Sequence, residues 1–183
     1  MGVVQNMTNE QNHQFLVVGL GKTGLSCVRY LLSRNCNVRV VDSRQKPPGL
    51  DELKQDYPQV EFIGGDFKEE IFTSAGEIIL SPGVAVNTPA IQSAIANGVS
   101  CYGDVELFAR YANAPIVAVT GSNGKSTLVT LLAEMIKASG KRVGLGGNIG
   151  TPVLELLQQT EQEPVDLYVL ELSSFQLETT SSL

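Results

Sequence analysis

The chain has 183 residues, of which 43% are hydrophobic and 17% are charged, a composition typical of a globular protein rather than a disordered one. Its formal net charge of −6 argues against a general nucleic-acid-binding protein, because neutralising a phosphate backbone requires a basic surface. The sequence has no run of about 18 apolar residues, so no membrane span is expected, and its three scattered cysteines favour a reducing cytoplasm over a disulfide framework or a zinc site.

Short apolar runs alternate with helix-like stretches in the first part of the chain. A polar lead-in, 1–14, holds the only histidine, His13, which we expect to be solvated rather than catalytic. The apolar runs then fall at 15–18, 38–41, 60–63, 78–80 and 99–102, and helical spacing is found at 23–34 and 88–96. This alternation indicates βαβ units with a parallel sheet, so residues 15–103 are predicted to form a Rossmann-like domain.

A glycine-rich turn follows the first predicted strand, where residues 19–24 match the pattern G-x-G-x-x-G. Asp42 ends the next strand, where an acidic residue would meet a ribose hydroxyl. Taken alone, these two features predict NAD binding. The glycines require only the close approach of a diphosphate, however, so any nucleotide diphosphate fits the pattern. Ser81, Pro82 and Gly83 form another tight turn on the same edge of the sheet.

A second α/β system begins after residue 103. It has strand-like runs at 116–119, 143–145 and 167–170, and helix-like segments at 105–111 and 126–138. Two glycine-rich phosphate-type turns lie about 100 residues apart, and each parallel sheet normally has its own ligand-binding edge. We therefore expect a second domain at 104–183. Because it has few strands and ends in a polar stretch, 173–183, we expect an incomplete P-loop-type α/β domain, part of a longer protein.

The most specific motif is the loop between the predicted strand 116–119 and the helix after it. It reads Gly121, Ser122, Asn123, Gly124, Lys125, Ser126, Thr127. The glycines let backbone N–H groups converge on an anion, and the helix N-terminus adds its positive dipole end. Lys125 can reach the β- and γ-phosphates of ATP, and the hydroxyl of Ser126 is placed to bind Mg²⁺. A surface glycine turn is the alternative, which the flanking strand and helix disfavour.

The loop departs from the usual P-loop pattern G-x-x-x-x-G-K-[ST], because position 119, where the first glycine would fall, is Val. The loop is therefore two residues shorter. Glu171 ends the predicted strand 167–170 and is a candidate second ligand for Mg²⁺. A solvated strand end is an equally good interpretation of Glu171, and Asp166 and Glu178 are nearby alternatives.

The shortened loop resembles that of the Mur ligase and folylpolyglutamate synthetase superfamily. Several further segments resemble Mur ligases: 19–24, 42–44, 47–50, 81–83, 103–108, 146–150 and 170–178, the last reading LELSSFQLE. The resemblance covers 15–183, and its most specific parts are the loop and ELSSFQLE.

The resemblance implies roles for individual residues. On the first domain, Gly21, Lys22 and Thr23 would meet the diphosphate of a UDP substrate, Asp42, Ser43 and Arg44 would frame the uracil, and Ser81, Pro82 and Gly83 would contact the uridine end. On the second, Asn148 would touch the muramoyl portion, residues 121–127 would bind ATP with Lys125 as the catalytic residue, and Ser126 and Glu171 would bind Mg²⁺.

The resemblance also implies a reaction, the addition of D-glutamate to UDP-N-acetylmuramoyl-L-alanine with ATP, through an acyl phosphate. The partners would be these small molecules, without nucleic acid or membrane, and the protein would be a cytoplasmic monomer. The family's metal-binding His, carbamylated Lys and D-glutamate site lie beyond the matching residues, so turnover by this chain is not expected.

Two other functions remain open from the residues. A nicotinamide-dependent dehydrogenase is suggested by residues 19–24 and Asp42, although no catalytic His or Tyr pattern follows and a P-loop has no task in hydride transfer. A non-enzymatic nucleotide-binding module that uses the P-loop as a switch is the third possibility.

Overall fold

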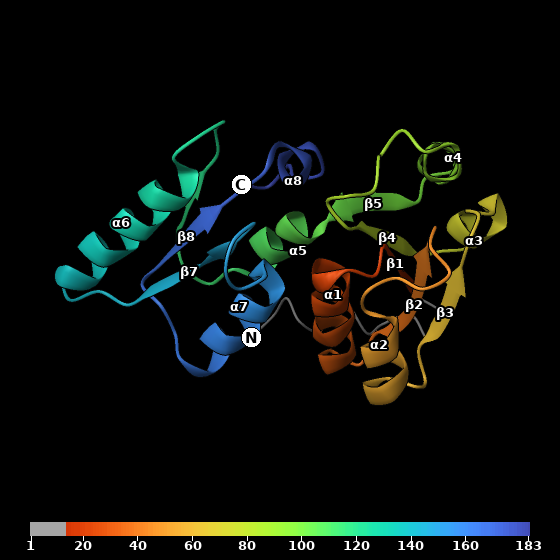
Figure 1. Ribbon diagram of the computed structural model, residues 1–183, viewed down its shortest axis with the longest axis horizontal. Helices are drawn as coiled ribbons and strands as arrows, with labels where there is room; N and C mark the ends of the chain where they lie inside the picture. Colours follow the sequence, from red (N-terminus) through yellow and green to blue (C-terminus); the bar gives the residue numbers. More distant parts are fainter. Residues whose placement is uncertain (1–13) are drawn as a thin grey trace. The chain divides into compact units, whose positions relative to one another are not determined.

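The computed structural model describes residues 14–183, so His13 and most of the polar lead-in lie outside it. The described residues form two compact α/β units, the first ending at Tyr102 and the second beginning at Gly103 (Figure 1). Within this range, no helix has both the length and the apolar character that crossing a bilayer would require.

The first unit is built on a five-stranded sheet with the order β3-β2-β1-β4-β5. Its strands are β1 (Gln14–Val18), β2 (Asn37–Asp42), β3 (Glu61–Gly64), β4 (Glu77–Leu80) and β5 (Ser100–Gly103). The central strand β1 pairs in parallel with both β2 and β4, so the strand order reverses at β1. In open α/β sheets a ligand binds beyond the carboxyl ends of the strands at such a reversal.

The helices of this unit are α1 (Lys22–Ser33), α2 (Leu50–Asp56), α3 (Glu69–Thr73) and α4 (Pro89–Ala96). One core cluster joins Leu16 and Val18 of β1 to Phe72 of α3 and Ile91 of α4. Successive strand residues point to opposite faces, so the other buried residues of β1 pack on the second face, where α1 contacts β1 and β2. Burial on both faces explains the uninterrupted apolar run of β1.

The second unit has a three-stranded parallel sheet with the order β6-β8-β7. Its strands are β6 (Ile116–Val119), β7 (Val143–Gly147) and β8 (Leu167–Glu171), and its helices are α5 (Asp104–Tyr111), α6 (Lys125–Ala138), α7 (Val153–Gln162) and α8 (Ser174–Glu178). The ring of Phe108 on α5 meets that of Tyr168 on β8 edge-on, with centroids 4.9 Å apart. The strand β6 is at the edge of this sheet. On the helix α6, the apolar side chains of Leu128, Leu131 and Met135 are exposed.

The α/β class, the parallel sheets and all eight predicted strands are confirmed in the described residues, with shifts of one or two residues at strand ends. Four helices, α2, α3, α7 and α8, were not predicted. The polar stretch 173–183, for which no helix was predicted, contains the short helix α8. There, Ser173 accepts a hydrogen bond from the Gln176 N–H, and the Gln176 side chain accepts one from the Ser173 N–H, a reciprocal capping box that stabilises a short helix.

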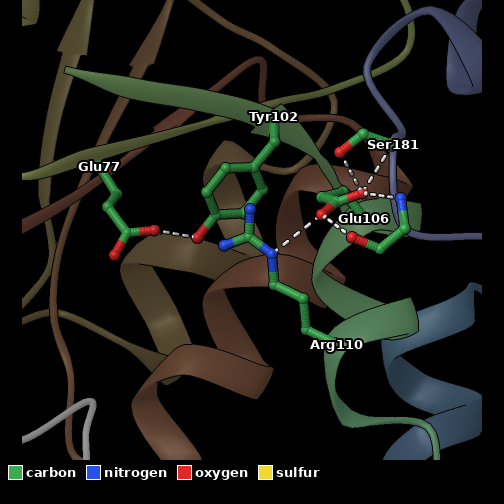
Figure 2. A network of polar contacts seen from close by, with 6 residues as sticks. Glu77, Tyr102, Glu106, Arg110 and Ser181 are labelled. Carbon is green, nitrogen blue, oxygen red and sulfur yellow. Dashed lines mark hydrogen bonds and ion pairs between the residues drawn. The ribbon is translucent and has the colours of Figure 1, made fainter. Parts of the chain in front are cut away.

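The segment after α8 is fastened to α5 through Glu106 (Figure 2). One oxygen of the buried carboxylate accepts hydrogen bonds from the N–H groups of Ser181 and Ser182, at 2.7 and 2.9 Å. The other accepts from the Ser182 hydroxyl at 2.6 Å and from Nε of Arg110 at 3.0 Å. Figure 2 also shows Tyr102 on β5 donating its hydroxyl hydrogen to Glu77 on β4 within the first unit.

Candidate functional site

The turn at 19–24 connects β1 to α1 at the point where the strand order reverses. Gly19 has φ +92°, a conformation that favours glycine, and a Cβ on Gly24 would lie 2.0 Å from the carbonyl oxygen of Gly19. A Cβ on Gly21 would meet nothing within 4 Å. Two glycines therefore shape the turn itself, whereas Gly21 leaves open the space where a diphosphate can approach the backbone and the N-terminus of α1.

Both oxygens of the Asp42 carboxylate accept hydrogen bonds from donors within the first unit. Its Oδ2 accepts from the Leu20 N–H at 2.7 Å and from Nη2 of Arg44 at 2.6 Å. Its Oδ1 accepts from the N–H and the Nε of Arg44, at 2.9 and 2.8 Å. Burial alone raises the pKa of Asp42, but these hydrogen bonds and the charge of Arg44 outweigh it and lower the pKa. Asp42 thus ties the glycine turn to the end of β2 and holds the half-exposed Arg44.

Ser81 lies against the same turn. Its hydroxyl donates to the carbonyl oxygen of Gly19 at 2.9 Å, and its Cβ lies 3.0 Å from where a Cβ on Gly19 would be. The structure therefore brings the turns at 19–24 and 81–83 together with Asp42, as the sequence predicted for one ligand edge. Lys22 and Thr23 lie in the first turn of α1, and Ser43 is exposed after β2.

The loop at 121–127 connects β6 to α6 and has the glycine conformations that a phosphate-binding turn needs. Gly121 has φ +145° and Gly124 has φ +77°, and a Cβ on either would meet nothing within 4 Å. Gly124 is the N-cap of α6 and provides no side-chain cap for the first N–H groups of the helix. These N–H groups and the helix dipole favour an anion at this end. Nζ of Lys125 donates to the carbonyl oxygen of Gly121 at 2.6 Å.

Glu171 lies beside this loop because of the register of β6 and β8, which pairs it with Val119. Its Oε2 accepts the hydroxyl hydrogen of Ser126 at 2.7 Å. This hydrogen bond is the main cause that lowers the pKa of Glu171; burial opposes it, and Asn148 and the charge of Lys125 add to the lowering. Of the two alternative carboxylates, Asp166 pairs with Arg142 at the opposite end of β8, and Glu178 is exposed on α8.

Asn148 follows β7 and contacts Glu171 twice. Its N–H donates to the carbonyl oxygen of Glu171 at 2.7 Å, and its Nδ2 donates to Oε1 at 3.2 Å. The sequence interpretation placed Asn148 on the muramoyl portion of a substrate and did not foresee these contacts. The only signal for them was the glycine pair before Asn148, which marks a close approach of backbone.

The second unit has the chemistry that a magnesium nucleotide requires. Ser126 and Glu171 provide hydroxyl and carboxylate oxygens, the hard donors that Mg²⁺ prefers, and the uncapped N–H groups at the start of α6 and the charge of Lys125 are groups that favour an anion. Mg²⁺ usually keeps several waters and takes further oxygens from the nucleotide, so two protein oxygens are a sufficient set.

Comparison with known proteins identifies the family of both units. The family model for the N-terminal domain of MurD-like Mur ligases matches residues 13–103, and the model for the Mur ligase middle domain matches residues 119–183. Among curated relatives, the UDP-N-acetylmuramoylalanine–D-glutamate ligase of Marinobacter nauticus is 56% identical over 168 residues, which is 92% of this chain and 37% of the relative. The enzyme of that name from Haemophilus influenzae is 55% identical over 177 residues, 97% of this chain and 39% of the relative.

The chain thus spans less than two fifths of the length of these relatives. Among solved structures, the UDP-N-acetylmuramate:L-alanyl-gamma-D-glutamyl-meso-diaminopimelate ligase from Neisseria meningitides has a TM-score of 0.53 at 15% identity, and the match covers 87% of this chain and 52% of that one. At this identity the match shows the fold alone. The two family models together account for most of the chain, which belongs to the Mur ligase family.

Proposed function

We propose that this chain provides the uridine-nucleotide-binding unit and the P-loop of an ATP-dependent ligase that joins D-glutamate to UDP-N-acetylmuramoyl-L-alanine. The observation that carries the proposal is the contact between Ser126 of the shortened P-loop and Glu171 at the end of β8. The names of relatives at 54–56% identity supply the substrate class.

In the second unit, residues 121–127 would hold the phosphates of ATP. Lys125 would move from the carbonyl of Gly121 to the β- and γ-phosphates, where its charge offsets the negative charge that develops during transfer. Ser126 and Glu171 would hold Mg²⁺, which, when bound, neutralises phosphate charge and orients the transferred group.

In the first unit, the UDP diphosphate would lie over Gly21 with Lys22 and Thr23 at the N-terminus of α1. Asp42 holds Arg44 in a fixed orientation, so Arg44 and Ser43 would frame the uracil with little further ordering. Ser81, Pro82 and Gly83 would close the uridine end.

The chemistry needs both nucleotides because a carboxylate is a poor electrophile. In the proposed reaction an oxygen of the L-alanine carboxylate attacks the γ-phosphorus of ATP, the bond to ADP breaks and an acyl phosphate forms. The amine of D-glutamate then attacks the acyl carbon and loses a proton, and phosphate leaves as the amide forms. Holding the two polyanions, ATP and the UDP-substrate, close together in the reactive orientation supplies much of the rate enhancement. We place this reaction in the cytoplasm, with the protein acting as a monomer.

The hydrogen bonds that the Asp42 carboxylate already accepts disfavour the dehydrogenase alternative. NAD binding would require this carboxylate to accept the ribose hydroxyls, yet Leu20 and Arg44 already donate four hydrogen bonds to it. The non-enzymatic module has no specific observation in its favour.

A titration of the chain with each nucleotide tests the proposal. By calorimetry, UDP-N-acetylmuramoyl-L-alanine and Mg·ATP should both bind the wild-type chain. Lys125→Ala should weaken ATP binding and leave UDP-substrate binding unchanged, while Lys137→Ala, which changes an exposed lysine at the end of α6, should alter neither. Binding of NAD in place of the UDP-substrate, or equal loss of both ligands in Lys125→Ala, would contradict the proposal.

A further inference from the structure

The strands β7 and β8 approach each other closely at the residue pair Gly147 and Glu171. A Cβ on Gly147 would lie 2.2 Å from the carbonyl oxygen of Glu171, and Gly147 has φ +115°. Only glycine fits this position without displacing β8. The next residue, Asn148, is therefore delivered to the end of β8, beside the carboxylate that faces the P-loop.

Asn148 makes one main-chain and one side-chain hydrogen bond to Glu171. Its N–H donates to the carbonyl oxygen of Glu171 at 2.7 Å, which fixes the two backbones together. Its Nδ2 donates to Oε1 at 3.2 Å. An ionised carboxylate only accepts hydrogen bonds, so the contact itself determines that the amide presents its NH₂ group.

The two oxygens of Glu171 are thus held by different elements. Oε1 is held by Asn148 after β7, and Oε2 by Ser126 at the start of α6. Two donors at opposite oxygens fix the rotation of the carboxyl group about its last side-chain bond, which would otherwise be broad. Because Oε2 is the oxygen on the loop side, this orientation turns it toward the place where Ser126 and the carboxylate can share a cation.

We propose that Asn148 is a positioning residue for Glu171, which holds the carboxylate in the orientation that lets it bind Mg²⁺ together with Ser126. The metal part of this proposal rests on the proposed function, whereas the contact between Asn148 and Glu171 does not. Donors behind a metal-binding carboxylate orient it and limit the reorganisation needed when the metal arrives.

Nuclear magnetic resonance tests the contact without metal or nucleotide. In the ¹⁵N-labelled chain, Glu171→Ala should shift the side-chain NH₂ resonances of Asn148, because their acceptor is removed. Glu178→Ala is the matched control, since Glu178 is an exposed carboxylate on α8, and it should leave these resonances in place. Unchanged Asn148 resonances in Glu171→Ala would overturn the proposal.

Calorimetry tests the metal part. ATP is titrated into the wild-type chain, Asn148→Ala and Asn97→Ala, each with and without Mg²⁺. Asn97 is a matched control in the first unit, because its exposed Nδ2 also donates one hydrogen bond, to the carbonyl oxygen of Ser93 at 2.8 Å. Asn148→Ala should reduce the gain in ATP affinity due to Mg²⁺ about 10-fold or more, with metal-free affinity unchanged. Asn97→Ala should behave as wild type.

The outcomes separate the two proposals. If Asn148→Ala lowers the affinity for ATP equally with and without Mg²⁺, Asn148 has a general structural role and the positioning role is overturned. The positioning role is also overturned if Mg²⁺ raises the ATP affinity of Asn148→Ala as much as that of the wild-type chain. Absence of any Mg²⁺ gain in the wild-type chain would count against the proposed function, and the positioning of Glu171 would then be judged from the Asn148 resonances.

Discussion

The hydroxyl of Ser126 donates to Oε2 of Glu171 at 2.7 Å, although 45 residues separate them in the sequence. The contact joins the first turn of α6 to the end of β8, and it exists because β6 and β8 are paired with Val119 opposite Glu171. In a parallel sheet, residues at the carboxyl ends of adjacent strands meet at one edge, which is where phosphate-type loops also lie.

Removing either partner should lower the affinity for ATP only when Mg²⁺ is present. Ser126→Ala removes one proposed metal oxygen, and Glu171→Gln replaces the charged one with an amide. We expect the Mg²⁺-dependent gain in ATP affinity to fall about 10-fold or more in each, as measured by calorimetry. Glu134→Gln, at an exposed position on the same helix, is the control. Wild-type Mg²⁺ dependence in Glu171→Gln would count against a metal-binding role.

Two glycines of the first turn should respond differently to alanine. Gly24→Ala places a Cβ 2.0 Å from the Gly19 carbonyl oxygen, so it should destabilise the first unit by about 3 kcal/mol or more. Gly21 has φ −97° and open space around it, so Gly21→Ala should fold normally and weaken UDP-substrate binding by crowding the diphosphate. Thermal unfolding and calorimetry measure the two effects. Strong UDP-substrate binding in Gly21→Ala would show that the diphosphate lies elsewhere.

Glu106 should stabilise the second unit in a defined pH window. Burial alone raises its pKa, but hydrogen bonds from Ser182, Ser181 and Arg110 outweigh it and bring the pKa to about 2, below the usual 4.5. The stabilisation is therefore complete above about pH 4.5 and is lost as the pH falls toward 2. In urea unfolding, Glu106→Gln should cost about 2 kcal/mol at pH 7 and progressively less toward pH 3.

Glu61→Gln, at an exposed position on β3, serves as the control for that series and should be close to neutral throughout. A cost in Glu106→Gln that does not change between pH 7 and pH 3 would show that the carboxylate charge is not what fastens Ser181 and Ser182.

Asp104 should have the opposite pH dependence. Burial is the main cause that raises its pKa to about 6, against hydrogen bonds from Val105, its own N–H and Gln176. Between about pH 4 and 6 the folded chain keeps a proton that the unfolded chain releases, so a rising pH lowers the free energy of unfolding. Asp104→Asn should remove this contribution to the pH dependence of the free energy of unfolding, as measured by urea unfolding at pH 4 and pH 7. If the free energy of unfolding changes equally with pH in the wild type and in Asp104→Asn, the raised pKa of Asp104 would be contradicted.

Much of the fold was predictable because its signals are local. Strands buried on both faces give continuous apolar runs such as 15–18, and the two phosphate-type turns carry glycines whose conformations the backbone requires. The helix α6 follows from apolar spacing over 14 residues. Shorter helices gave weaker patterns, and α8 has only five residues, held by its capping box and by the hydrogen bond between Gln176 and Asp104.

The contacts within the sites were less predictable because they depend on strand register. Sequence patterns placed Asp42 and Glu171 at strand ends but did not predict which groups donate hydrogen bonds to their carboxylates. Leu20 reaches Asp42, and Asn148 reaches Glu171, because neighbouring strands end side by side, whereas Arg44 lies two residues after Asp42 and reaches it locally. For Glu171 the alternatives were even from the sequence, and pairing of β6 with β8 is what favours it over Asp166 and Glu178.

The central claim is that one chain holds two separate nucleotide sites, one on each unit. The most direct measurement is a pair of calorimetric titrations, with Mg·ATP added to the chain saturated with UDP-N-acetylmuramoyl-L-alanine, and with the ligands in the reverse order. The predicted result is one site for each ligand, filled in either order without displacement. Displacement of one ligand by the other, or binding of both to a single site, would contradict the claim.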